Sequence, residues 1–358
     1  MLTVLHTESS VGWGGQENRT LNEARELKRR GHRALLATRP GAELARRARA
    51  EGFEVFEVPM RSNLDLPGVM RLMAIIGRER VDVVNTHSGR DSFLAGLAGR
   101  LARRRPRIVR TRHLALPITS RWGYARLPHQ VVTVSRQVRE DLIAQGVPAG
   151  RIVAIPTGID VGRYASATPV LREELAAGTR LLIGTVAILR KKKGHAYLLE
   201  AIPEVLREFP DALFVFAGDG PQRQNLERRI VELGLSDSVR ILGLRRDVPN
   251  VLASLDLFVL PTLQEALGTS YAEAMATGCA TVGCAVGGVP EVVHDGETGL
   301  LVPPAESAPL AAAILALLRD PARRAAMGAA GRRLAEREYS LTVMSERMVA
   351  LYESLLAA

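Results

Sequence analysis

Short apolar runs alternate with longer stretches of helical periodicity along the first half of the chain. The apolar runs have the length of strands, and between them apolar positions recur every three or four residues. Continuous apolar runs are typical of strands that are buried on both faces, so the alternation predicts a parallel sheet covered by helices. The expected strands are 2–5, 33–37, 55–58, 81–84, 108–110 and 131–134, and the expected helices are 16–30, 42–50, 66–77, one from 91 and one that ends near 146.

The second half repeats this alternation after a short linker at 165–169, and it ends in three consecutive helical stretches. A second parallel sheet is therefore predicted. Its expected strands are 181–187, 214–217, 239–242, 255–260, 280–283 and 299–304, and the final helices are 307–318, 321–338 and 341–355. The pattern as a whole indicates an α/β protein of two domains.

Length and composition agree with two domains and suggest anionic partners. The chain has 358 residues, too many for one small core, and 47% of them are hydrophobic. The formal net charge of +10 favours nucleotides, nucleic acid or acidic lipid as partners. A nucleic-acid binder remains an alternative on charge alone, but no nucleic-acid partner is expected, because aromatic residues make up only 4% of the chain and no recognition motif interleaves them with arginine.

Two cysteines and the absence of a long apolar segment indicate a cytoplasmic protein. Cys279 and Cys284 have no companion Cys or His at metal-ligand spacing, so buried thiols are expected and no metal site is predicted. No stretch approaches the ~20 apolar residues of a membrane span. The first residues also lack the basic region and apolar core of a signal peptide.

The stretch 261–278 places two carboxylates, Glu265 and Glu273, on either side of a turn at Gly268. It follows an expected buried strand and precedes an expected helix. In an open parallel sheet, ligands bind at the carboxyl ends of strands, and the amides that begin the next helix favour phosphate. Both carboxylates could then accept hydrogen bonds from sugar hydroxyls. The alternative is a capping box, with Ser270 at the N-cap and Glu273 three residues later.

Other candidate residues also lie where an expected strand ends. Some of these positions have structural alternatives, such as a tight turn, a capping histidine or a solvated basic surface. The candidates are Gly14, Gly15 and Glu17 after the first strand, His87 after the fourth, His113 after the fifth, the basic run 190–193, and Gly218 and Gly220 around Asp219.

The run Pro-x-x-x-Glu-x-x-Gly followed by Glu-Ala-Met-Ala-x-Gly, in 261–278, resembles the signature of the family 4 retaining glycosyltransferases. The resemblance implies the GT-B fold, in which two Rossmann-like domains have parallel sheets facing a central cleft and the last helix crosses back to the first domain. The implied parts are an acceptor-side domain at 1–166, a donor-binding domain at 167–338 and a crossover helix at 339–358.

The resemblance also implies roles for the candidate residues. Glu265 would contact the transferred sugar and Glu273 the ribose of the donor. The family usually has an arginine where this chain has Ile188, so Arg190 is expected to act with Lys193 on the diphosphate. The remaining implied contacts are His87 beside the transferring sugar, Leu267, Gly268, Thr269, Ser270, Gly218 and Gly220 at the donor, and Gly14, Gly15, Glu17 and His113 at the acceptor or cleft loop.

The implied reaction is retaining transfer of a sugar from a nucleotide diphosphate sugar to an acceptor hydroxyl, without metal or cofactor. UDP-sugars come first as donors and GDP-sugars second. The acceptor would be a glycan or a lipid-linked intermediate of bacterial surface polysaccharide or lipopolysaccharide. A sugar-nucleotide epimerase and a non-catalytic sugar-nucleotide-binding protein are the alternatives.

The sequence from Arg100 to Arg112 contains seven arginines and no acidic residue, next to the apolar tract 93–97. Such a surface is suited to peripheral contact with an anionic membrane at the inner face of the cytoplasmic membrane, or to an anionic acceptor. A solvated basic surface is the alternative.

Overall fold

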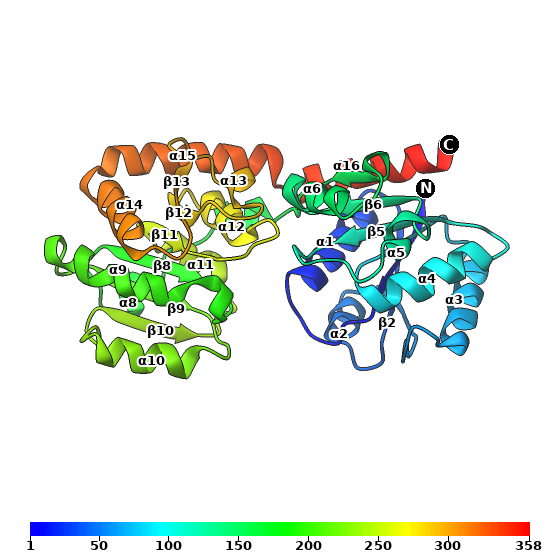
Figure 1. Ribbon diagram of the computed structural model, residues 1–358, viewed down its shortest axis with the longest axis horizontal. Helices are drawn as coiled ribbons and strands as arrows, with labels where there is room; N and C mark the ends of the chain where they lie inside the picture. Colours follow the sequence, from blue (N-terminus) through cyan, green and yellow to red (C-terminus); the bar gives the residue numbers. More distant parts are fainter. The chain divides into compact units, whose positions relative to one another are not determined.

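The computed structural model describes all 358 residues and divides into two compact units (Figure 1). The N-terminal unit contains Met1–Gly158 together with Leu341–Ala358, and the C-terminal unit contains Ile159–Ser340. The divisions therefore fall after residues 158 and 340, where the sequence analysis placed them after residues 166 and 338. Each unit is a parallel sheet with helices packed on it, as the apolar pattern predicted.

The N-terminal unit contains a seven-stranded sheet in the order β3-β2-β1-β4-β5-β6-β7, in which every pairing is parallel. The strands are β1 (Thr3–Glu8), β2 (Arg33–Thr38), β3 (Glu54–Glu57), β4 (Val83–Thr86), β5 (Arg107–Arg112), β6 (Gln130–Thr133) and β7 (Ile152–Ala154). The sequence analysis missed β7, which is short and lies at the edge of the sheet. The helices between these strands of the N-terminal unit are α1 (Gly15–Arg29), α2 (Glu43–Ala50), α3 (Leu66–Arg78), α4 (Gly89–Leu101), α5 (Trp122–Ala125) and α6 (Arg136–Ala144), with a 3₁₀ turn η1 (Ala149–Arg151).

Alternate residues of the central strand β1 serve two different cores. Val4 belongs to the apolar cluster formed with α1 and the C-terminal helix α16 (Leu341–Ala357). Leu5 belongs to the cluster on the other face, formed with α3 and α4. Because successive side chains of a strand point to opposite faces, this fully buried strand packs on helices from both sides.

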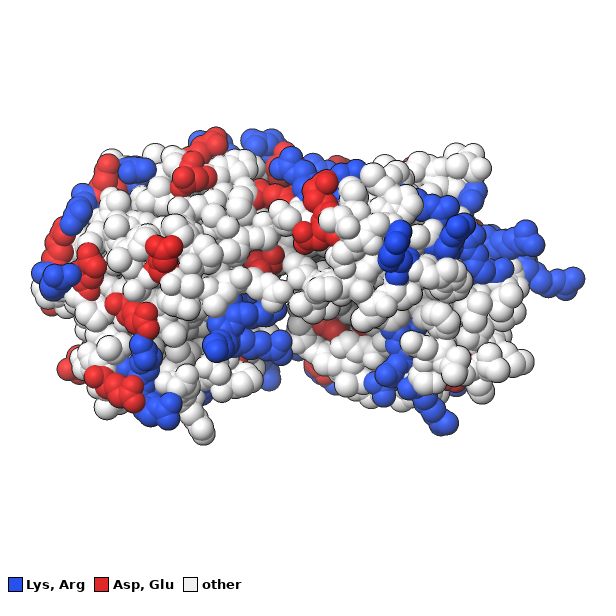
Figure 2. Space-filling model, in the orientation of Figure 1, with Lys and Arg blue, Asp and Glu red and all other residues white.

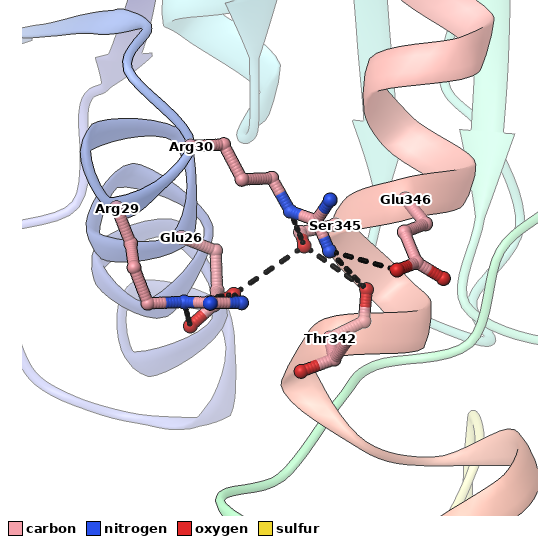
Figure 3. A network of polar contacts seen from close by, with 6 residues as sticks. All are labelled: Glu26, Arg29, Arg30, Thr342, Ser345 and Glu346. Atoms are coloured by element: carbon pink, nitrogen blue, oxygen red, sulfur yellow. Dashed lines mark hydrogen bonds and ion pairs between the residues drawn. The ribbon is translucent and has the colours of Figure 1, made fainter.

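The C-terminal helix α16 packs on α1 through a polar network at the surface (Figure 3). The Arg30 guanidinium donates to Ser345 Oγ at 2.8 Å and to the Thr342 carbonyl at 3.2 Å, and it pairs with Glu346 at 3.1 Å. Ser345 Oγ in turn donates to Glu26 at 3.4 Å. The predicted return of the last helix to the first domain is therefore confirmed.

A second contact of α16 is buried. Tyr352 donates a hydrogen bond to Glu23 Oε1 of α1 at 2.5 Å and accepts one from Asn85 of β4 at 2.9 Å. Asn85 also accepts from Thr111 of β5 at 2.9 Å. A helix from the end of the chain thus completes the hydrogen bonds of polar groups that would otherwise be unpaired inside the N-terminal unit.

The C-terminal unit contains a six-stranded parallel sheet in the order β10-β9-β8-β11-β12-β13. The strands are β8 (Leu182–Val186), β9 (Leu213–Ala217), β10 (Val239–Gly243), β11 (Leu257–Leu260), β12 (Thr281–Cys284) and β13 (Gly299–Val302). The helices are α7 (Val161–Ala165), α8 (Leu171–Glu174), α9 (His195–Glu208), α10 (Arg223–Glu232), α11 (Val248–Ala253), α12 (Thr269–Ala276), α13 (Val289–Val292), α14 (Ser307–Arg319) and α15 (Pro321–Glu338), with a 3₁₀ turn η2 (Lys191–Lys193).

Two further expectations concern burial and hydropathy. Cys279 and Cys284 are buried free thiols, as predicted. None of the helices combines the length and the hydropathy that crossing a bilayer requires. The predicted α/β class and two-sheet organisation are confirmed.

Candidate functional site

In the C-terminal unit the candidate residues gather where the strand order reverses. The chain proceeds outward from β8 through β9 to β10, and then returns to the other side of β8 to form β11, β12 and β13. The loops that follow the neighbouring strands β8 and β11 therefore lead away from each other. Ligands of open α/β sheets bind at such a point. Lys193 lies on the first of these loops and Glu265 on the second.

Lys193 and Glu265 form an ion pair at this position. Their side chains are only 17% and 18% exposed, so the pair lies largely out of water. The two loops are also joined by backbone, because the Leu263 amide donates to the Lys192 carbonyl at 2.7 Å. Gly194 approaches β11 so closely that a Cβ there would lie 1.8 Å from the Pro261 carbonyl oxygen. The structure therefore brings together the cation and the carboxylate that the sequence analysis assigned to diphosphate and sugar.

Helix α12 begins beside this pair without a side-chain cap. Its N-cap is Gly268, which has a φ of +97°, and no side chain accepts from the first amides of the helix. The capping-box alternative is wrong, because Ser270 is the second helical residue and Glu273 the fifth. The uncapped amide end begins at Thr269 and is suited to an anion such as phosphate.

Glu273 lies on α12 beside Tyr164 of α7. The Tyr164 hydroxyl donates a hydrogen bond to the Glu273 carboxylate. Burial raises the pKa of Glu273 to about 7, although Tyr164, Arg163 and Lys193 oppose the shift. Sequence reasoning missed Tyr164, since α7 is a single turn with no motif of its own.

Gly218 and Gly220 support the loop after β8. A Cβ on Gly218 would lie 1.9 Å from the Ala187 carbonyl oxygen, and one on Gly220 would lie 2.7 Å from that of Leu189. The Leu189 amide donates to the Asp219 carbonyl at 3.0 Å. These glycines therefore let the loop after β9 pack directly against the loop that leads to Lys193.

Arg190 does not join the pair of Lys193 and Glu265. It is exposed and makes no ion pair, and it lines a separate pocket with residues of α9 and α10. Ile188, at the position where the family usually has arginine, is 48% exposed. Leu267, the remaining predicted donor contact, is buried just before Gly268.

The N-terminal unit has its own reversal of strand order, between β1 and β4. Gly14 is the N-cap of α1 and Gly15 is its first residue. Glu17 is buried in the first turn of α1, with its carboxylate 3.4 Å from the place where a Cβ of Gly14 would lie. His87 follows β4 directly. The predicted candidates of this unit therefore lie at the loops of two neighbouring strands.

Three histidines are connected in a row within the N-terminal unit. His87 Nε2 lies 3.0 Å from His6 Nδ1, and His87 Nδ1 lies 3.1 Å from His113 Nε2. Burial is the largest cause that holds the pKa of His87 and of His113 well below the ordinary value, so both rings are neutral near pH 7. The two predicted candidates belong to one network, and His6 of β1 is a member that sequence reasoning missed.

Glu8, at the end of β1, is a second missed residue. It accepts hydrogen bonds from the Ser10 amide at 2.8 Å and from Gln16 Nε2 at 2.5 Å. Burial, followed by the nearby charge of Asp91, raises the pKa of Glu8 to about 8. A carboxyl group at the end of a buried strand, just before a glycine loop, is the signal in the sequence that could have identified it.

Comparisons with known sequences match both units. Residues 13–163 match the family described as Glycosyltransferase Family 4, and residues 168–334 match the family described as Glycosyl transferases group 1. The GDP-mannose-dependent alpha-(1-6)-phosphatidylinositol monomannoside mannosyltransferase of Mycolicibacterium smegmatis is 32% identical over 312 residues, which cover 81% of each chain. The UDP-Gal:alpha-D-GlcNAc-diphosphoundecaprenol alpha-1,3-galactosyltransferase of Escherichia coli is 29% identical over 234 residues, which cover 60% of each.

Solved structures share the fold. An Anabaena protein crystallised in complex with UDP superposes with a TM-score of 0.89 at 22% identity, covering 99% of this chain and 100% of that one. At this level of identity the likeness concerns the fold alone.

The raised pKa of Glu8 predicts a pH-dependent effect of Glu8→Gln on stability. A carboxyl whose folded-state pKa of about 8 exceeds its ordinary 4.5 binds more protons when folded, so its contribution to stability falls as pH rises between these values. Glutamine keeps the side chain neutral throughout. In thermal unfolding, the variant should match the parent near pH ~5 and unfold several degrees higher near pH ~8.5.

Glu140→Gln is the control, because Glu140 is exposed and pairs only with Arg139. It should show no such divergence. An equal shift of the unfolding temperature by Glu8→Gln at both pH values would contradict a neutral Glu8.

Proposed function

The chain belongs to glycosyltransferase family 4, and on this premise we propose that it transfers a sugar from a nucleotide diphosphate sugar to an acceptor hydroxyl with retention of the anomeric configuration. Both sequence families and the relative of 32% identity support the transferase class. The resemblance inferred from 261–278 is thereby confirmed. The observation that carries the proposal is the Lys193–Glu265 pair beside the uncapped amide end of α12.

The donor diphosphate is proposed to bind at the start of α12. The amides from Thr269 onward and the ammonium group of Lys193 would both face the phosphates, and the helix dipole adds to their attraction. Glu273 would accept hydrogen bonds from the ribose, and Glu265 from the transferred sugar. The donor base is proposed to be uridine or guanosine, the two that the named relatives use.

Catalysis would come from charge placed where the leaving group becomes negative. As the bond to the anomeric carbon breaks, negative charge grows on the diphosphate, and Lys193 and the helix amides stabilise it. Arg190, which was expected to act with Lys193, lies just before the same turn but lines a separate pocket, so it has no part in this scheme. The departing phosphate would accept the proton of the acceptor hydroxyl on the same face as the leaving bond. The scheme uses no protein nucleophile, metal or cofactor.

The N-terminal unit is proposed to contact the sugar and the acceptor. Its candidates are the loop at Gly14 and Gly15, the buried Glu17, and the linked pair His87 and His113. Neutral histidines can both donate and accept hydrogen bonds, which suits hydroxyl recognition without attracting the negative diphosphate. Both ring nitrogens of His87 face other histidines, so His87 would act through His113.

The acceptor is proposed to be carried by a lipid at the inner face of the cytoplasmic membrane, as an intermediate of surface polysaccharide or lipopolysaccharide. In the loop after β5, Leu116 is 48% exposed and Trp122, at the start of α5, is 51% exposed. The Arg112 guanidinium donates to the Leu114 and Leu116 carbonyls at 2.9 and 2.7 Å and so holds this loop. Basic side chains gather in the part of the view where α4 and α5 lie (Figure 2). Exposed apolar groups amid arginines suit an anionic membrane surface.

The ribose role of Glu273 predicts selective and pH-dependent nucleotide binding. With EDTA present, one nucleoside diphosphate should raise the unfolding temperature of the protein more than the others. Its affinity, measured by calorimetry, should increase between about pH 6 and 8 as Glu273 ionises, because its pKa is about 7 and a carboxylate accepts stronger hydrogen bonds. Glu273→Gln should weaken binding and remove the pH dependence, whereas Glu297→Gln, at an exposed site, should not. Parent-like binding by Glu273→Gln would refute the assigned role.

The leaving-group role of Lys193 predicts a loss of rate in Lys193→Met. Removing one preorganised charge should lower kcat on the order of a hundredfold. Lys192→Met is the matched control, because Lys192 is the exposed neighbour in the same turn and only its carbonyl is used. Both variants should be checked for folding by circular dichroism. A similar loss of kcat in the two variants would show that net charge, and not the position of Lys193, matters.

The membrane proposal predicts binding to vesicles that contain phosphatidylglycerol and none to vesicles of phosphatidylcholine alone, measured by co-sedimentation. Leu116→Ser should reduce binding, because it removes apolar area that would enter the bilayer surface. Leu64→Ser should have no effect, although Leu64 is even more exposed at 84%, since it lies in another loop. Equal loss in the two variants, or equal binding to both vesicle types, would reject this surface.

A further inference from the structure

The C-terminal unit contains a pocket between α9 and α10, next to the turn Lys191–Lys193. Its volume is about 280 Å³. Its wall is formed by residues of α9 and α10 together with Arg190, Lys191 and Leu263. Neither Lys193 nor Glu265 lines it, so it is distinct from the proposed donor site.

The wall of the pocket carries excess positive charge. Four of its residues are basic and two are acidic, which gives a net charge of +2. The acidic residues are already paired, Glu200 with Arg229 at 2.5 Å and Glu232 with Arg228 at 3.6 Å. Arg190 and Lys191 have no ion-pair partner. Two cations are therefore available to an anionic ligand.

The amino end of α9 adds to this positive charge. Gly194 and His195, where the helix begins, are part of the wall. The first turn of this 14-residue helix contains no acidic residue, and no side chain caps it. A helix amino end attracts anions, most strongly when no side chain has taken its amides. His195 is also 3% exposed, and neither of its ring nitrogens has a hydrogen-bond partner in the protein.

The remainder of the wall is suited to a sugar. Tyr197, Gln222 and Asn225 contribute a hydroxyl and two amides to the wall. Asn225 already donates to Gln222 Oε1 at 3.1 Å and accepts from Arg228 at 2.7 Å, and the remaining amide hydrogens can pair with hydroxyl groups. Leu226 and Leu263 provide apolar surface. A volume of this size accommodates a monosaccharide and is small for a nucleotide sugar.

From these features we infer that the pocket is a binding site for a phosphorylated monosaccharide. The phosphate binds Arg190, Lys191 and the amino end of α9, and the sugar hydroxyls bind the amide side chains at the start of α10. Binding fixes the turn Lys191–Lys193, whose last residue pairs with Glu265 and whose Lys192 carbonyl holds the β11 loop. The sugar phosphate therefore acts as an effector of the donor site. This last step rests on the proposed function, whereas binding itself does not.

Calorimetry with glucose 6-phosphate and mannose 6-phosphate tests the site, with the free sugars and inorganic phosphate as comparison ligands. At least one sugar phosphate should bind the parent protein more tightly than inorganic phosphate or either sugar. Asn225→Glu, which places a carboxylate in the wall, should weaken this binding at least about tenfold. Gln224→Glu is the matched control, since it adds the same charge at the adjacent exposed residue of α10, outside the pocket.

The proposal would be overturned if both variants weakened sugar phosphate binding equally. It would also be overturned if inorganic phosphate bound as tightly as the sugar phosphates, or if neither sugar phosphate bound. Binding of the sugar phosphate should persist in Lys193→Met and in the presence of saturating nucleoside diphosphate. Competition by the nucleotide would show that the pocket is part of the donor site and would refute the proposal. In the parent, the sugar phosphate should change nucleotide affinity severalfold, an effect lost in Asn225→Glu. If nucleotides do not bind but sugar phosphates do, the proposed function fails and the pocket stands.

Discussion

Parallel strands impose one constraint from which the candidate sites follow. All carboxyl ends of a parallel sheet lie at one edge, and a reversal of strand order separates the loops of two neighbouring strands there. The reversals occur between β1 and β4 in one unit and between β8 and β11 in the other. Lys193 and Glu265 are 72 residues apart in the sequence and yet form an ion pair for this reason. Close backbone approaches, such as that of Gly194 to Pro261, hold the two loops together.

Burial sets the charge state of the groups at these edges. A carboxyl group that leaves water must find a cation or retain its proton. Glu265 meets Lys193 and its charge is paired, whereas Glu8 has only neutral donors and a raised pKa of about 8. Glu273 lies between these cases, with a tyrosine donor and a pKa of about 7. Three carboxyl groups of the same type thus differ in charge because their partners differ.

The sequence predicted most of the two sheets and the main candidates, because both depend on local pattern. Buried parallel strands are continuous apolar runs, and only the short edge strand β7 was missed. The motif at 261–278 identified Glu265 and Glu273 because strand, loop and helix are contiguous there. Tyr164 and His6 were not predicted, since each meets its partner only after the chain has folded over a long distance. The ion pair of Lys193 with Glu265 was missed for the same reason.

The turn Lys191–Lys193 shows why identical neighbours can have different surroundings. A 3₁₀ turn has three residues per turn, so consecutive side chains point about 120° apart. Lys193 accordingly pairs with Glu265, Lys192 is exposed, and Lys191 lines the pocket of α9 and α10. This run of three lysines thus places one cation beside Glu265 and another in the pocket wall, and the same short segment of backbone joins the two. Under the two proposals, a ligand at one site would act on the segment that positions the cation of the other.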